Sequence, residues 1–117
     1  MLIRGQFELE AGGKNRGFKF GILASEYFCE MENITLKEME GRLQNPTPKT
    51  AINVAVAALR SYNESHGISE VVKRSDVADW LDEIGIDKFF AKIEECLQIY
   101  HDHADKEEAE KNVLAPM

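Results

Sequence analysis

The chain has 117 residues, of which 44% are hydrophobic and 30% charged, and its formal net charge is −7. This length is typical of a single domain with one modest core. The acidic balance argues against nucleic-acid binding, which depends on clustered lysine and arginine. Cys29 and Cys96 show no paired spacing, and no apolar signal segment opens the chain, so we expect a reducing, cytoplasmic setting without a disulfide.

Residues 2–20 alternate between apolar and polar side chains on both sides of a Gly-rich turn. Phe7 and Leu9 share one face before the turn, and Phe18 and Phe20 share one face after it. Alternation with period two around such a turn predicts a β-hairpin. Because an isolated hairpin is marginal in water, its apolar face should pack on a helix, and the central helix is the expected partner. Its edges should stay open to another subunit or to a partner strand.

The spacing of apolar residues becomes helical after residue 21. The pattern predicts a helix that ends at Asn33, a residue that tolerates the left-handed conformation. Thr35 and Glu38 then form a predicted capping box, in which each side chain reaches the backbone N–H of the other. The short helix that follows should direct three apolar residues inward, namely Leu36, Met39 and Leu43.

Residues 47–67 are the least polar part of the chain. Thr47 can cap a helix, Pro48 suits the first helical position, and Gly67 suits the end of the helix. The middle of this helix contains one polar residue, Asn53, so the helix should be surrounded by other elements. Its apolar run is too short for a membrane span, which needs about 20 residues.

The last part of the domain should contain two further helices. Residues 68–73 are compatible with a short strand, a turn of helix or an ordered loop. A helix should start near Ser75 and stop at Gly85. The final helix should carry an apolar seam that packs on its own domain. The seam residues are Ile86, Phe90, Ile93, Leu97 and Tyr100.

These elements together predict a mainly α (α+β) fold. The hairpin at 2–20 should pack on a bundle of about five helices, residues 21–100, around the central apolar helix. Residues 1–100 should form this single domain. Residues 101–117 are rich in acidic residues and alanine, and we expect them to be a charged, mobile C-terminal tail.

No motif typical of catalysis or metal binding emerges. His101 and His103 flank Asp102, but residues two apart on a helix point about 200° away from each other, whereas helical zinc sites use histidines four apart. The Gly12-Gly13 turn lacks the spacing of a phosphate loop. We therefore predict no enzyme, with no catalytic residue, cofactor or metal site. Exposed positions of the last helix, such as Phe89 and Tyr100, are the candidates for partner binding, with core packing as the competing interpretation.

Three segments carry a resemblance to a known family. Residues 16–21 read RGFKFG and lead from the hairpin into a helix, residues 33–36 read NITL at the next helix start, and residues 76–84 read DVADWLDEI. Over roughly residues 5–100, the chain resembles the tail assembly chaperones of long-tailed bacteriophages and prophages. In that family a strand pair reading roughly F-K-F-G, a G-I-T-L-like helix start and a late D-V-x-D-W-L segment follow one another. Asn33 stands where the family commonly has glycine.

The resemblance implies a non-catalytic protein of the bacterial host cytoplasm. Such chaperones bind the long, helical tape-measure protein, keep it soluble and help tail-tube subunits assemble around it. The resemblance also implies weak self-association, and family members often have a longer form made by ribosomal frameshifting. Neither nucleic acid nor membrane is an expected partner. The alternative hypothesis is a small cytoplasmic adaptor or regulatory domain that binds one defined protein.

Overall fold

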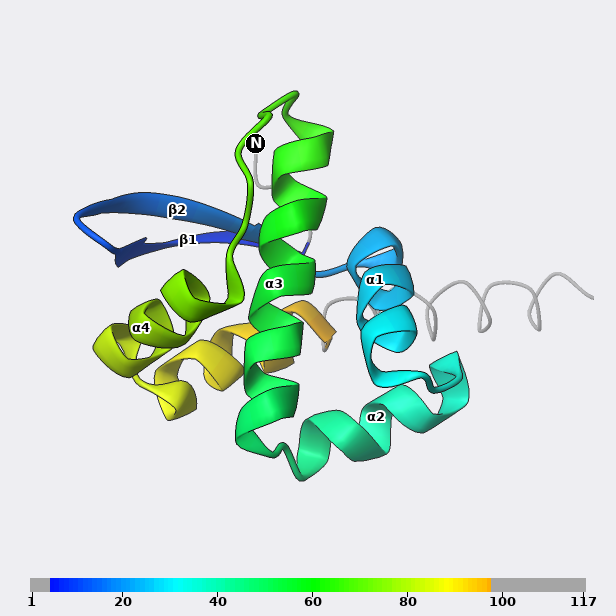
Figure 1. The fold of residues 1–117 in the computed structure, drawn as a ribbon. Helices are drawn as coiled ribbons and strands as arrows, with labels where there is room; N and C mark the ends of the chain where they lie inside the picture. Colours follow the sequence, from blue (N-terminus) through cyan, green and yellow to red (C-terminus); the bar gives the residue numbers. More distant parts are fainter. Residues whose placement is uncertain (1–4, 98–117) are drawn as a thin grey trace, which may run out of the picture.

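The computed structural model describes residues 5–97, which form an N-terminal hairpin and five helices (Figure 1). The predicted fold class, mainly α with a hairpin packed on helices, is confirmed. In chain order the elements are β1 (Gln6–Ala11), β2 (Lys14–Lys19), α1 (Ile22–Glu32), α2 (Leu36–Gln44), α3 (Pro48–Ser65), α4 (Arg74–Ile84) and a last helical segment, residues 86–97.

The two strands form an antiparallel hairpin with a two-residue turn. Phe7 lies opposite Phe18, as the alternation of the sequence requires. Gly12 and Gly13 make the turn with φ angles of +62° and +84°. Short hairpin turns need this left-handed backbone, which glycine adopts at little cost.

Helix boundaries follow the capping residues of the sequence. The Thr47 hydroxyl oxygen accepts a hydrogen bond of 3.2 Å from the Thr50 N–H at the start of α3. Thr35 and Glu38 form the predicted capping box of α2. Asn33 ends α1 with a φ of 54°. These three predictions are confirmed, because each cap satisfies backbone groups that a helix end leaves unpaired.

The long helix α3 lies at the centre of the fold, with the hairpin, α1, α2 and α4 arranged around it (Figure 1). Every residue from Val54 to Leu59 is buried. Asn53, just before this run, is only 2% exposed. A helix that is apolar nearly all round is stable when other elements cover it on several sides, as they do here.

Both faces of the hairpin contact helices. On one face, Phe7 and Phe18 stack with 5.2 Å between ring centroids, and each meets Phe89 of segment 86–97 at an edge. On the other face, Gly17 lies so close to the ring of Tyr62 in α3 that a Cβ would overlap it. The apolar face therefore packs on a helix as predicted, but its aromatic partner is Phe89 rather than a residue of α3.

The buried face of segment 86–97 agrees with the predicted seam in part. Ile93 is buried, and Phe90 and Leu97 are partly buried against the core, as predicted. The most buried side chains, however, are Phe89, Ile93 and Cys96, and the first predicted seam residue, Ile86, is 43% exposed. The helix is thus turned about its axis relative to the prediction. The cause is the aromatic pair of the hairpin, since Phe89 has to face Phe18, with 5.4 Å between their ring centroids.

Two predictions fall outside the described residues: the end of the last helix, at 98–100, and the charged tail at 101–117. None of the helices between residues 5 and 97 combines the length and the apolar character that a membrane crossing needs.

Candidate functional site: an apolar groove between α1 and α2

A groove with mainly apolar walls runs between α1 and α2. It consists of two hollows, each with a volume of about 290 Å³. Ile22, Ser25 and Leu36 line both hollows, so the two form one continuous surface, which we call the α1–α2 groove. The first hollow extends to the end of segment 86–97, and the second continues along α1. The other apolar walls are Phe20, Leu23, Met39, Leu43 and Leu97.

Two large apolar side chains of this groove stand exposed where its two hollows meet, one on α1 and one on α2. Ile22 is 68% exposed and Leu36 is 56% exposed. Leaving such a side chain in water forgoes roughly 1.5–3 kcal/mol of burial. Single exposed apolar residues are ordinary on protein surfaces. A pair of exposed apolar side chains within one apolar groove is instead typical of a surface that receives an apolar partner.

The exposure of Leu36 corrects the sequence analysis, which placed it inward together with Met39 and Leu43. Met39 and Leu43 are buried, as predicted. Leu36 is the first residue of α2, so it lies at the end of the helix rather than in the middle of its buried stripe. Ile22 is likewise the first residue of α1. Both exposed residues therefore occupy the first position of a helix.

The single hydroxyl in both hollows is already satisfied. The Ser25 side chain donates a hydrogen bond of 2.8 Å to the Gly21 carbonyl. A buried hydroxyl without a partner would disfavour an apolar ligand, because its desolvation would be uncompensated. With this bond formed inside the protein, the floor of the groove behaves as apolar surface.

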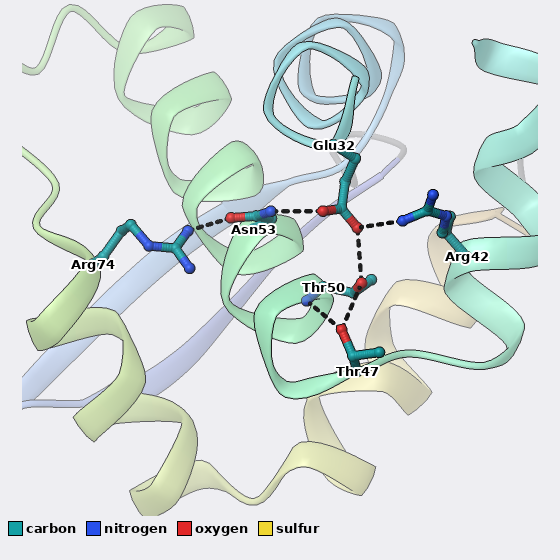
Figure 2. Close-up of polar contacts among 6 residues, drawn as sticks. All are labelled: Glu32, Arg42, Thr47, Thr50, Asn53 and Arg74. Atoms are coloured by element: carbon teal, nitrogen blue, oxygen red, sulfur yellow. Dashed lines mark hydrogen bonds and ion pairs between the residues drawn. The ribbon is translucent and has the colours of Figure 1, made fainter. Parts of the chain in front are cut away.

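A partly buried polar network joins α1 and α2, the two helices that form the groove walls, to α3 and α4 (Figure 2). The Glu32 side chain, at the end of α1, is only 3% exposed. Its carboxylate accepts hydrogen bonds from Thr50 Oγ1 at 2.7 Å and from Asn53 Nδ2 at 2.9 Å, both on α3. Arg42 of α2 forms an ion pair with the same carboxylate at 3.7 Å. The Asn53 side-chain oxygen accepts from Arg74 at the start of α4.

This network explains how a charge and an amide are tolerated in the interior. A buried carboxylate is costly unless it is paired and hydrogen-bonded, and Glu32 has both kinds of partner. Asn53 uses both ends of its amide, donating to Glu32 and accepting from Arg74. Because Arg42 belongs to α2 and Glu32 to α1, the network also sets the position of one groove wall against the other.

The groove offers a thiol but no activated nucleophile. Cys29, which lines the second hollow, is a free cysteine. Burial, with a smaller contribution from the Glu38 carboxylate, raises the pKa of this thiol above its usual value. It is therefore a weak nucleophile at neutral pH, since the thiolate is the reactive form. Among residues 5–97, no group of three or more metal-ligating side chains lies close enough together to hold a metal ion.

Phe89 and Tyr100, the two residues predicted from the sequence to bind a partner, are not among the described residues that line this groove. Phe89 is 0% exposed and packs against the hairpin, so the prediction that it stands on the surface is wrong, and the competing interpretation of core packing holds. Tyr100 lies outside the described residues. The exposure of Ile22 and Leu36 had one signal in the sequence. Each directly follows a residue that starts a helix, and a side chain at that position is least covered by its own helix.

Comparison of the chain with protein-family models, with curated proteins and with solved structures gives no match.

Proposed function

We propose that this protein is a non-catalytic tail assembly chaperone of a long-tailed phage or prophage. It binds the tape-measure protein in the cytoplasm of the bacterial host and helps the tail-tube protein assemble around it. The observation that carries the proposal is the open α1–α2 groove, in which Ile22 and Leu36 form an exposed apolar ridge between the two hollows. An apolar groove of this kind suits the apolar stripe of a helix, and covering such stripes keeps a long helical chain from aggregating.

The residues behind the family resemblance support the proposal by their positions. Phe20 belongs to the RGFKFG segment and Leu36 to the NITL segment, and both line the groove. The third segment lies on α4, where Val77 and Leu81 are buried and Trp80 carries the Arg16 guanidinium over its ring. Two of the three segments thus build the candidate binding surface, and the third stabilises the fold.

Co-expression with the tape-measure protein encoded in the same genome tests the proposal. The wild-type protein should keep the tape-measure protein soluble and co-purify with it. Leu36→Asp should abolish co-purification, because it places a charge on the apolar ridge of the groove. Val71→Asp is the matched control: Val71 is 80% exposed and lines neither hollow, so this variant should bind as the wild type does.

Circular dichroism of both variants separates lost binding from lost folding, since both substitutions fall on exposed positions. A genome in which no tail-tube or tape-measure gene lies near this gene would contradict the proposal. So would binding of the tape-measure protein that Leu36→Asp leaves intact. A single partner of fixed stoichiometry, unrelated to phage tails, would favour the adaptor hypothesis instead.

A further inference from the structure

The helices that form the walls of the α1–α2 groove are strongly acidic. α1 contains Glu26, Glu30 and Glu32 and no basic residue. α2 adds two glutamates and two basic residues, Lys37 and Arg42. Glu32 and Arg42 pair with each other inside the network, which leaves four exposed carboxylates against one exposed ammonium. We call the exposed charged side chains of these two helices the rim. The rim carries three net negative charges, and Glu26, Glu40 and Lys37 are its members that line the hollows.

The groove also has a defined internal shape. Ile22 and Leu36 line both hollows and so form a ridge between them. Each hollow, at about 290 Å³, is at or below the lower end of the range for small-molecule sites. Two hollows separated by a ridge suit two side chains from one helix face, since residues three or four apart lie about 5–6 Å from each other. Ridges that pack into grooves are the usual mode of helix packing.

From this charge and shape we infer that the groove receives an amphipathic helix with two apolar anchors, three or four residues apart, flanked by lysine or arginine. The inference rests on the proposed function in one respect: it takes the same groove as the place where a foreign helix binds. What it adds is the chemistry of the partner segment: the part of a long helical chain that the groove recognises is one with apolar anchors flanked by basic residues.

Charge complementarity decides among the three occupants that the groove could have. Residues 98–117 follow Leu97, a groove residue, but they contain five acidic residues and two lysines. A second copy of the chain brings a net charge of −7. Both have the same sign as the rim and would be repelled at short range. A basic helix has the opposite charge to the rim, so electrostatic attraction steers it towards the groove and speeds association. Its apolar anchors then supply most of the affinity.

Two synthetic peptides test this inference on the full-length protein by fluorescence anisotropy. Both are Ala-based helices of about 18 residues with leucines at positions i and i+4, long enough to have measurable helicity. One peptide has lysines beside the leucines and the other has glutamates. The lysine peptide should bind at least tenfold more tightly than the glutamate peptide at low salt, and the ratio should shrink at about 1 M salt, where screening acts within about 3 Å.

Two sets of protein variants locate the binding. Glu26→Lys combined with Glu40→Lys should weaken the lysine peptide about tenfold at low salt and improve the glutamate peptide. Asp79→Lys, at an exposed position of α4, makes the same type of charge change outside the groove and should alter binding less than twofold. Leu36→Ala should weaken both peptides about fivefold at every salt concentration, because it removes apolar contact rather than charge.

Equal affinity for the two peptides, or no binding of either, would overturn the inference. So would a rim double variant that binds the lysine peptide as the wild type does. These outcomes are separate from the test of the proposed function. Capture of the tape-measure protein without any effect of the rim charges would overturn only the inference, whereas the expected peptide pattern without tape-measure binding would support the inference and overturn the chaperone proposal.

Discussion

Glu32 is the residue whose removal tests the architecture most directly. Its carboxylate joins α1 to α3 through Thr50 and Asn53, and to α2 through Arg42 (Figure 2). We compare Glu32→Ala, which deletes the acceptor, with Glu32→Gln, which keeps the size of the side chain and one acceptor oxygen. Comparing the two variants separates the contribution of the hydrogen bonds to stability from the contribution of the charge.

The expected loss for Glu32→Ala is about 3 kcal/mol in the free energy of unfolding. Thr50 can still donate to the Thr47 hydroxyl, which is 3.1 Å away. Asn53 Nδ2, in a side chain that is 2% exposed, has no such substitute, and an unsatisfied buried group costs about 1–3 kcal/mol. The lost charge-assisted bonds and the space left by the carboxylate supply the rest.

The expected loss for Glu32→Gln is about 1 kcal/mol. The glutamine oxygen can accept from Asn53, while its amide donates to Thr50, whose hydroxyl turns to donate to Thr47. What disappears is the ion pair with Arg42, whose side chain is 50% exposed, and pairs of this kind contribute about 0–1 kcal/mol.

Urea unfolding followed by circular dichroism measures both variants. With a slope of about 1.5 kcal/mol per M, the midpoint should fall by about 2 M for Glu32→Ala and by less than 1 M for Glu32→Gln, at an unchanged slope. A Glu32→Ala protein within 1 kcal/mol of the wild type would refute the reasoning. Equal losses for the two variants would show that the charge, rather than the hydrogen bonds, holds the helices together.

Two further predictions follow from close packing and from burial. Gly17→Ala should destabilise the protein by about 3 kcal/mol or more, because a Cβ there overlaps the Tyr62 ring. Gly41→Ala is the control: this residue of α2 has open space around it, so the variant should be more stable by about 0.5–1 kcal/mol. Similar unfolding midpoints for the two variants would contradict the close contact between Gly17 and Tyr62. When native protein is alkylated at pH 8 and followed by mass spectrometry, Cys29 should react before Cys96. Burial raises the pKa of Cys96 to about 11, so little of this thiol is thiolate until the pH approaches that value. Equal rates for the two cysteines would argue against the burial of Cys96.

Local signals in the sequence were sufficient for the helix boundaries. A cap acts within three or four residues, so Thr47 beside Pro48 and the box of Thr35 with Glu38 could be recognised without knowledge of the fold. The hairpin followed from the same kind of local information, because its turn and its alternation are contained in residues 2–20. The overall class then follows, since a hairpin and several amphipathic helices need each other to bury their apolar faces.

The face that a helix turns inward is not a local property. In segment 86–97 two apolar lines pass through Ile93, one containing Phe90 and the other Phe89, and spacing alone does not choose between them. The choice is made by Phe7 and Phe18 of the hairpin, which lie 82 and 71 residues earlier in the chain and form an aromatic cluster with Phe89. The prediction that Phe89 is exposed was wrong for this reason.

The polar network around Glu32 was visible in the sequence only as one unexplained residue. Asn53 stood alone in an apolar helix, and a buried amide must have partners. Its partners, Glu32 and Arg74, are each 21 residues away, on α1 and α4. Nothing in the local pattern of Glu32 distinguishes it from the solvent-exposed glutamates of α1, so this site required the three-dimensional arrangement.

The network and the groove have different roles in binding: the network positions the groove walls, and the groove contacts the partner. α2 is held to the domain by its buried residues Met39 and Leu43 and by the ion pair of the half-exposed Arg42, while Leu36 at its first turn remains exposed. A helix could therefore dock against Leu36 without displacing any core contact. Loosening the network should weaken stability and binding together, because the two walls of the groove would no longer be fixed. A substitution at Leu36 should weaken binding alone, and this difference separates a residue that contacts the partner from one that only positions the surface.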